Sequence, residues 1–589
     1  MRAWQEDTNG NYIVAVENSY DDLGRAKGST YVVGDRTMAY EINYRPNSNL
    51  VNYISMPVAG VQSNIGYTYD EFERVTRKQH SFSNAINFCE EYQYYSYTDA
   101  EGEQHTTSLV SSLSFGGNSS NTTSAVYSYI YDNLGNITQI KKDGVIINEY
   151  TYDSLGQLVC EEDAVAGVTY IYYYDKSGNI TKKDEYPYYS GTLMGDYIGY
   201  LSGSKETVGT YTYGNTTWGD MLTAYNGTAI TYDEIGNPLN WHNISSMTWE
   251  GRELQAATVT AGPRAVYEYN SDGIRTKKTL ASILKYDYVL DGSMILSETV
   301  TNSSAGTSRT LYYLYGESGS VQGFIYNNQH YYFQKNLQGD VIRILNNYGN
   351  VVTEYTYDAW GKVLTTTGSL ASTIGQYNPF RYRGYYYDAE TGFYYLQSRY
   401  YDPTVGRFLN ADAIIGANGG VQGYNMFAYC NNNPIMGYDP MGYSLRPTTK
   451  IINDGGGGRG GDAENDNTSE EESAVLTHYK KDKVSDFGSY SIKFDYEYQI
   501  SNGKVIDAEI TRHEIIEEPP LYEVEIVHAE PYIDDFYGNG GNYIKFVFTI
   551  KITLSVGIPG LQDALEWISI DFAVAEGDVY TIILIKEGD

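Results

Sequence analysis

Residues 131–140 read Tyr-Asp-Asn-Leu-Gly-Asn-Ile-Thr-Gln-Ile, one copy of a unit that recurs along most of this chain and decides its fold. The unit is an aromatic run that ends in Tyr-Asp, then a Gly or Gly-Asn turn, then a second short run. Aromatic and β-branched residues that alternate with polar ones suit a half-buried strand, and the turn glycine supplies a positive φ. Each copy therefore predicts a β-hairpin.

Further copies of the Tyr-Asp unit follow at a period of roughly 20 residues. They are Tyr20-Asp21, Tyr69-Asp70, Tyr152-Asp153, Tyr174-Asp175, Tyr232-Asp233, Tyr357-Asp358 and Tyr387-Asp388. Successive hairpins of this kind bury their faces against their neighbours, as in other repeat proteins. We therefore expect an all-β fold in which the first ~440 residues form one continuous, strongly twisted antiparallel sheet without long helices.

The unit resembles the YD repeat of the Rhs/YD-repeat family, whose members include polymorphic toxins and wall-associated proteins. The resemblance is densest between Asn378 and Tyr443, where Arg381-Tyr-Arg-Gly-Tyr-Tyr-Tyr-Asp388, Asn431-Asn-Asn-Pro434 and Asp439-Pro-Met-Gly442 are similar to the family's core-associated module. It implies that the repeats wind into a β spiral, a hollow shell or cocoon that encloses a variable C-terminal polypeptide, often a toxin. Because family shells are generally longer, we expect an incomplete shell that is open at its N-terminal end.

Four segments are predicted along the chain. Residues 1–377 form the YD-repeat shell, and residues 378–443 form the closing module, which is similar to an autoprotease. Residues 444–475 contain a Gly-rich and then acidic run with nothing to bury, which predicts a flexible linker. Residues 476–589 predict a small β-rich C-terminal domain, with Leu561–Trp567 as its one helical candidate.

The closing module contains the one group of residues with a predicted chemistry. The resemblance implies an aspartate pair that cuts the chain after the Asp-Pro-x-Gly-x motif and frees the cargo. Matched to this chain, the pair is Asp412 and Asp439, and the cut bond joins Tyr443 to Ser444. Two close carboxylates can hold one proton between them, so that the ionised group activates water and the protonated group polarises the scissile carbonyl.

Supporting residues come from the same motifs. Pro434, Pro440 and Gly442 belong to the matched pattern around the second aspartate. Arg407 is expected to lie beside the pair, where a fixed positive charge would hold one aspartate ionised. An equally good interpretation of Arg407 is a surface or cross-strand salt bridge.

Two positions differ from the family pattern. Ala413 follows Asp412 where a proline is usual, and Tyr443 stands where leucine is common. Asp402, in Asp402-Pro403, is an alternative first carboxylate, although it also resembles another repeat turn. The competing interpretation is that Asp412 and Asp439 are turn and capping residues of a sealing plug.

Charge and composition exclude some partners and sites. The net charge of -34 disfavours nucleic acid or an anionic membrane as a partner, and the segment from Tyr443 onward carries 28 acidic and 12 basic residues. Cys89, Cys160 and Cys430 are too few for a disulfide framework and are expected to be buried packing residues. His513-Glu514-Ile-Ile-Glu517 lacks the second histidine of a zinc-protease motif, so we expect no metal and no cofactor.

The N-terminal sequence and the apolar runs bear on where the protein is located. No apolar run like that of a signal peptide follows Met1, and none reaches the roughly 18 apolar residues of a membrane span. Because the chain also opens within the array, with a recognisable repeat by residue 20, we expect it to be part of a longer exported bacterial protein, secreted or attached to the surface or wall.

Two functions fit these observations. In the first, the chain is an Rhs-type shell whose partner is its own C-terminal domain as cargo, with a cognate immunity protein as a second partner. In the second, it is a YD-repeat surface or wall protein that serves binding or adhesion without catalysis.

Overall fold

The computed structural model describes residues 2–6, 12–33, 36–56, 63–82, 85–98, 104–117, 123–189, 201, 205–316, 319–413, 421–443 and 445–447, and seven strands within 477–584. The chain divides into two compact units, Met1–Gly458 and Arg459–Asp589. Antiparallel β-structure dominates both units, which confirms the predicted all-β fold class.

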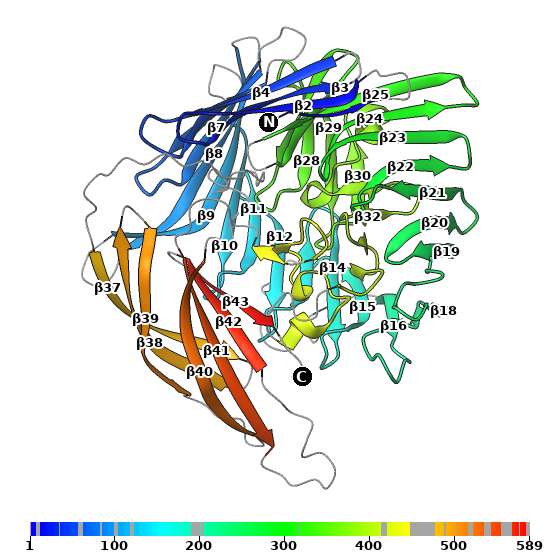
Figure 1. Cartoon of the computed structure of the whole chain (residues 1–589). Helices are drawn as coiled ribbons and strands as arrows, with labels where there is room; N and C mark the ends of the chain where they lie inside the picture. Colours follow the sequence, from blue (N-terminus) through cyan, green and yellow to red (C-terminus); the bar gives the residue numbers. More distant parts are fainter. Residues whose placement is uncertain are drawn as a thin grey trace. The chain divides into compact units, whose positions relative to one another are not determined.

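The first unit contains an 18-stranded sheet in which each strand pairs with the next along the chain (Figure 1). Its strands are β1 (Arg2–Glu6), β2 (Tyr12–Tyr20), β3 (Ala26–Val33), β4 (Arg36–Tyr44), β5 (Val51–Ser55), β6 (Ser63–Tyr69), β7 (Val75–Phe82), β8 (Ala85–Thr98), β9 (Gln104–Gly117), β10 (Thr123–Tyr131), β11 (Ile137–Lys142), β12 (Val145–Tyr152), β13 (Leu158–Asp163), β14 (Val168–Tyr174), β15 (Ile180–Pro187), β16 (Glu206–Thr212), β17 (Ala224–Tyr225) and β18 (Thr228–Ala229).

A second sheet of 12 strands continues the same meander. Its strands are β19 (Ile244–Glu250), β20 (Glu253–Val259), β21 (Arg264–Tyr269), β22 (Arg275–Leu280), β23 (Leu284–Asp291), β24 (Met294–Asn302), β25 (Thr307–Tyr315), β26 (Val321–Tyr326), β27 (Gln329–Lys335), β28 (Val341–Asn346), β29 (Val351–Tyr357) and β30 (Val363–Thr367).

The prediction of one continuous sheet is therefore wrong, because the meander breaks between β18 and β19. Only the isolated bridges Tyr232↔Pro238 and Trp241↔Ile244 occur in this stretch. Trp241 is 1% exposed, and its indole N–H donates to Asp402 Oδ2 at 2.7 Å. The stretch thus bonds to the closing module instead of extending the sheet.

The hydrogen bonds of the Tyr-Asp turns explain the repeat. In the copy at residues 131–140, Asp132 Oδ1 accepts the N–H groups of Leu134 and Asn136 at 2.9 and 2.8 Å, and Gly135 has a φ of 83°. The tyrosine of the next copy, Tyr152, donates its hydroxyl to Ile137 O at 2.7 Å. In this copy the aspartate therefore closes its own turn, and the tyrosine of the next copy bonds its hairpin to the preceding one.

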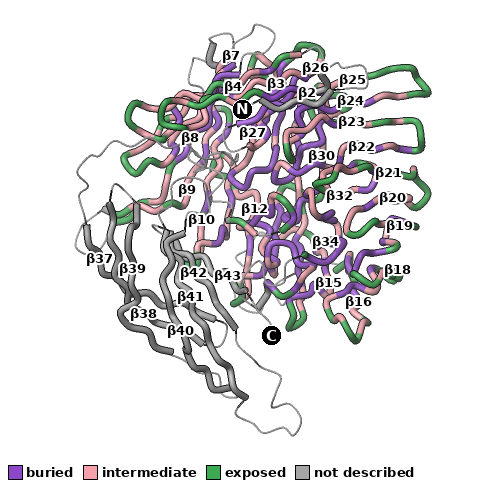
Figure 2. The backbone as a smooth tube through the Cα atoms, in the orientation of Figure 1, coloured by how far each residue is buried: buried purple, intermediate pink, exposed green. Residues whose placement is uncertain are grey.

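The closing module consists of short elements that bond to both sheets. Its elements are η2 (Tyr382–Gly384), β31 (Tyr386–Asp388), β32 (Phe393–Tyr395), β33 (Tyr400–Asp402), β34 (Arg407–Phe408), η3 (Val421–Tyr424), η4 (Cys430–Asn432) and β35 (Gly437–Tyr438). The short helix α1 (Ile374–Tyr377) precedes the module, and β36 (Arg446–Pro447) follows it. Asn432 Nδ2 donates to Gln157 Oε1 in the first sheet at 2.9 Å, and Asp388 accepts Arg275 of the second sheet at 2.6 Å. Figure 2 shows buried residues gathered along this module, whereas the hairpin ends of β22–β25 are exposed.

The second unit has a three-stranded sheet, β37 (Thr477–Phe487), β38 (Tyr490–Ser501) and β39 (Lys504–Ile515), and a four-stranded sheet. The latter consists of β40 (Tyr522–Asp534), β41 (Tyr543–Leu554), β42 (Ile568–Ala575) and β43 (Asp578–Leu584). The β-rich second unit confirms the prediction of a β-rich C-terminal domain. Of the predicted linker, residues 444–475, the structure describes residues 445–447, in which Arg446–Pro447 form β36. The rest of the linker lies outside the described residues, as does the helical candidate Leu561–Trp567.

Candidate aspartate site

Asp412 and Asp439, the two aspartates proposed from the sequence, meet at one arginine that the sequence analysis did not identify. Arg399 Nη2 lies 2.8 Å from Asp412 Oδ2 and 3.2 Å from Asp439 Oδ2. Because both oxygens contact the same nitrogen atom, they lie within about 6 Å of each other. Asp412 is 5% exposed and Asp439 is 2% exposed, so the group is buried.

The antiparallel register of β33 and β34 brings Arg399 to this place. Tyr401 pairs with Phe408, so Arg399, just before β33, lies beside the residues that follow β34. Met426 O accepts both Arg399 Nη1 and the N–H of Asp412, at 3.1 and 2.8 Å, which fixes the arginine and the aspartate to one acceptor. The guanidinium also lies over the Phe408 ring, 3.5 Å from its centroid.

Asp439 caps the turn that leads to the predicted cut. Its Oδ1 accepts the N–H groups of Gly442 and Tyr443 at 2.8 and 3.0 Å, while Arg399 Nε donates to Gly442 O. Gly442 has a φ of 78°, and a Cβ atom there would lie 2.5 Å from Ser398 Oγ. A glycine is therefore required at this motif position, both for its φ and for the space it leaves.

The predicted cut follows directly on this turn. Met441 and Tyr443 are 42% and 40% exposed, so water reaches the segment. Ser444, on the other side of the bond, lies outside the described residues.

A second arginine lies near the pair. Burial lowers the pKa of Arg252, whereas Asp412 and Tyr443 act in the opposite direction, so these side chains are close enough to interact electrostatically. Arg252 Nη2 also donates to Ala411 O. Burial likewise lowers the pKa of Arg399, and the two aspartates offset part of that effect.

Cys430 also lies near Asp439 but is unsuited to act as a nucleophile. Burial raises the pKa of its thiol well above the usual range, and the Asp439 carboxylate adds to this effect. The three cysteines are all buried and free, which confirms the prediction that they are packing residues.

The other arginine and aspartate proposed from the sequence lie elsewhere. Arg407 donates to the Tyr213 hydroxyl and to Asp220 O, so the arginine that bonds to the pair is Arg399 and the expectation for Arg407 is corrected. Asp402 Oδ2 accepts Trp241 Nε1 and contacts His242 Nε2 at 2.7 and 2.9 Å, and its Oδ1 accepts Thr404 N. Asp402 is thus a buried turn residue that anchors the break between the sheets.

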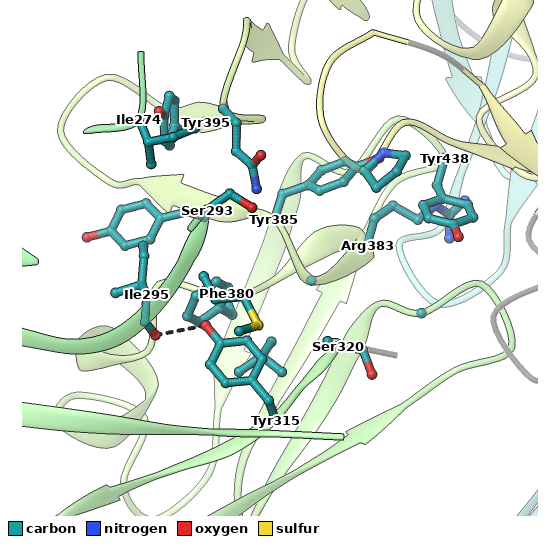
Figure 3. Close-up of a pocket in the computed structure, with 18 of the residues that line it drawn as sticks. Ile274, Ser293, Ile295, Tyr315, Ser320, Phe380, Arg383, Tyr385, Tyr395 and Tyr438 are labelled. Carbon is teal, nitrogen blue, oxygen red and sulfur yellow. Dashed lines mark hydrogen bonds between the residues drawn. The ribbon is translucent and has the colours of Figure 1, made fainter. Parts of the chain in front are cut away.

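The prolines of the motif have structural positions. Pro434 O accepts the Tyr382 hydroxyl at 3.1 Å and also Arg383 Nη2. Pro440 and Arg446 line a cavity of ≈ 260 Å³. Its walls also include Tyr385 and Tyr438, which are labelled in Figure 3. The hairpin that carries the motif is therefore one wall of an aromatic cavity.

The arrangement of acidic, histidine and cysteine side chains bears on metal binding in the described part of the chain. No group of three or more His, Cys, Asp or Glu residues there is arranged to hold a metal ion. The main chain of His513 and Glu514 lies in β39, opposite Phe494 and Lys493 of β38. No helix among the described residues is long and apolar enough to cross a membrane.

Sequence reasoning missed Arg399 and Arg252. Arg399 stands in Gln397-Ser398-Arg399-Tyr400, within the segment of densest resemblance, but nothing in its spacing separates it from Arg407. Arg252 comes from the β19–β20 turn, far away in the chain, and no sequence signal connects it to the pair.

Comparisons with known proteins agree on the type of fold. The family profile described as Teneurin YD-shell matches residues 301–435. A relative, the tRNA3(Ser)-specific nuclease WapA of Bacillus spizizenii, is 37% identical over 228 residues, 38% of this chain and 9% of that protein. Toxin protein Tse5 of Pseudomonas aeruginosa is 44% identical over 64 residues, 11% of this chain and 5% of that protein.

A solved structure matches a larger share of the chain. The Photorhabdus luminescens Tc holotoxin pore with a mutated TccC3 component matches 76% of this chain and 21% of its own chain, with a TM-score of 0.55 and 21% identity. At this identity the match shows a shared fold. The chain spans less than a tenth of the length of the WapA protein it matches.

Proposed function

The chain belongs to the Rhs/YD-repeat family, and from this premise we propose that it is part of a shell that encloses and delivers a C-terminal effector. Toxin names among the relatives, Tse5 in particular, support an association with toxins. In this proposal the C-terminal domain is the cargo, a cognate immunity protein protects the producing cell, and the chain acts after export. Its acidic C-terminal segment favours a protein target or a membrane pore over nucleic acid.

We also propose that the chain cuts itself between Tyr443 and Ser444. The observation that supports this most is the meeting of Asp412 and Asp439 at Arg399, next to the turn that presents Tyr443. Asp439 accepts two main-chain N–H groups and an arginine, and these bonds favour its ionised form. The scheme requires that Asp412 carry a proton while it acts, in place of its ion pair with Arg399.

The reaction would follow the aspartyl scheme. Asp439 removes a proton from water, the water oxygen bonds to the Tyr443 carbonyl carbon, and Asp412 protonates the carbonyl oxygen. When the C–N bond breaks, the proton on Asp439 passes to the departing amine of Ser444. Asp412 recovers its proton as the new carboxyl group forms, so both groups return to their starting state.

A denaturing gel of the purified full-length chain tests this reaction. Wild type is expected to give a tail fragment of about 16 kDa from the 66.1 kDa chain, and its N-terminal residue should be Ser444. Asp412→Asn and Asp439→Asn should each leave one full-length band. Asp402→Asn is the matched control and should still cut, since its carboxylate bonds to Trp241 and His242.

A second candidate is a non-catalytic surface or wall protein. The same geometry favours it in one respect, because Asp439 caps a turn and Arg399 forms ion pairs with both aspartates, as in a structural plug. A wild-type chain that stays intact after long incubation would support this candidate over self-cleavage.

A bacterial growth assay distinguishes an effector role of the tail from a structural role. Residues 444–589 would be produced alone in the cytoplasm and, with an export signal, in the periplasm. Growth arrest in either compartment is expected for an effector. Normal growth in both would leave the tail as a binding or structural domain.

A further inference from the structure

The predicted cut lies in the connection of a two-stranded hairpin within the first unit. β35 and β36 are antiparallel, with Gly437 opposite Pro447 and Tyr438 opposite Arg446. A cut after Tyr443 would leave β35 on the shell fragment and β36 on the tail fragment. The pairing between the strands does not depend on the bond that is cut.

Leu445, the second residue after the cut, packs into a slot formed by Gly437, Cys430 and Asn433. A Cβ atom on Gly437 would overlap Leu445 Cδ1 and lie 3.0 Å from Cys430 Cβ and 3.3 Å from Asn433 O. Glycine is therefore required for the leucine to approach this closely. Leu445 also packs against the main hydrophobic core.

The slot is anchored by residues on the shell side of the cut. Asn433 Nδ2 donates to Asn136 Oδ1 in the first sheet at 3.0 Å, and Gly437 N donates to Asn433 O at 3.1 Å. Cys430 is 1% exposed. None of these bonds involves a tail residue, so the slot persists after the cut.

We propose that this slot and β35 hold the new N-terminal end of the tail after cleavage, so that cutting and release are separate steps. The occupant is the segment Leu445–Pro447, bound by main-chain pairing and by one leucine side chain. The inference rests on the self-cleavage proposed above and adds a binding site for its product. Because the contact is short, the tail leaves when the slot is weakened, without unfolding of the shell.

The test uses the full-length chain with a C-terminal affinity tag, bound to resin after cleavage is complete. A denaturing gel measures the fraction cut, and the rate at which the shell fragment washes off in native buffer measures release. Wild-type fragments should stay together, and Leu445→Ala should release the shell at least about tenfold faster. Leu134→Ala, the same change at a side chain that is 79% exposed, should match wild type.

A second variant checks that the slot itself is responsible. Gly437→Ala puts a methyl group where Leu445 packs, so it should also speed release. The double variant should release no faster than either single one, because both changes remove the same contact. If the effects of the two changes on the release rate were fully additive, the proposed binding site would be contradicted.

The outcomes separate this inference from self-cleavage. A single band on the denaturing gel would contradict the cut and, with it, a binding site for the product. Two bands on the gel, together with equal release rates for wild type and Leu445→Ala, would agree with self-cleavage but contradict the proposed binding site for the product.

Discussion

Arg399 and Asp412 form a buried ion pair at the centre of the closing module, with Nη2 and Oδ2 2.8 Å apart and side chains 1% and 5% exposed. Arg399→Gln would leave two carboxylates buried without their shared cation. Removing one partner of such a group costs about 3–5 kcal/mol of unfolding free energy. We expect this loss in urea unfolding, together with loss of the tail fragment on a denaturing gel.

Arg407→Gln is the matched control for Arg399→Gln. Arg407 is also buried, at 3% exposed, but it bonds to Tyr213 and Asp220. Arg407→Gln should therefore lower stability and still allow cleavage. Equal loss of cleavage in both variants would contradict a specific role for Arg399.

The sequence predicted the aspartate pair but not which of these two arginines contacts it. The motif predicted that Asp412 and Asp439 belong together, and a single arginine joins them. The choice between Arg399 and Arg407 depends on the register of β33 and β34. Asp402 pairs with Arg407, which puts Arg407 at the end of that hairpin away from Asp412. Strands of three and two residues carry too little sequence pattern to fix such a register.

The repeat array was easier to predict because its signal is local. The Asp132 side chain closes its turn by bonding to residues two and four positions ahead. The turn is therefore determined by residues within one copy of the unit. The break between the two sheets was missed because its cause is not local. Trp241 and His242 bond to Asp402, 161 and 160 residues away, and no period reveals that contact.

The tyrosine that fastens successive hairpins is open to a direct test. Tyr152→Phe removes the hydroxyl that donates to Ile137 O at 2.7 Å. Loss of one such bond should lower the unfolding free energy by about 1 kcal/mol, measured by urea unfolding.

Tyr313→Phe serves as the control for Tyr152→Phe. The Tyr313 hydroxyl is buried and has no hydrogen-bond partner among the described residues. Its removal should be neutral or stabilising, because an unpaired buried hydroxyl is costly. An equal cost in both variants would contradict a stabilising role for the hydrogen bond from Tyr152 to Ile137.

Asp388 joins the closing module to the second sheet through two cations. It lies 2.6 Å from Arg275 Nη1 and 2.7 Å from Lys278 Nζ. Burial opposes ionisation of Asp388, but the two cations prevail and hold its pKa below 3.8. Asp388→Asn should therefore cost about 3–5 kcal/mol at neutral pH in urea unfolding.

The lowered pKa of Asp388 determines how its contribution to the free energy of unfolding is lost in acid. Its contribution is present above pH 3.8 and is lost as the pH falls through the lower, native value. Asp287→Asn is the control, since its pair with Lys285 is 39% and 50% exposed and should contribute little. A difference between wild type and Asp388→Asn that stays constant well below pH 3.8 would contradict the ion-pair assignment.

Glu161 should make the shell sensitive to alkaline pH. Its Oε1 accepts Ala359 N at 2.6 Å and its Oε2 accepts the Tyr172 hydroxyl at 2.8 Å, so it joins β13 of the first sheet to the turn after β29 of the second. Burial raises the pKa of Glu161 to about 8, and Asp358 adds to this effect. The native state therefore favours the protonated form.

The sign of the pH effect follows from that raised pKa. A native pKa above the ordinary 4.5 gives a stability contribution that is full below 4.5 and is lost as the pH rises through about 8. Glu161→Gln keeps an acceptor for Ala359 and cannot ionise. The variant should match wild type at pH 5 and exceed it at pH 9 by on the order of 3 kcal/mol. Thermal midpoints at both pH values measure this, with Glu91→Gln, 45% exposed, as the pH-independent control. An equal alkaline loss in wild type and Glu161→Gln would show that another group weakens the joint between the sheets.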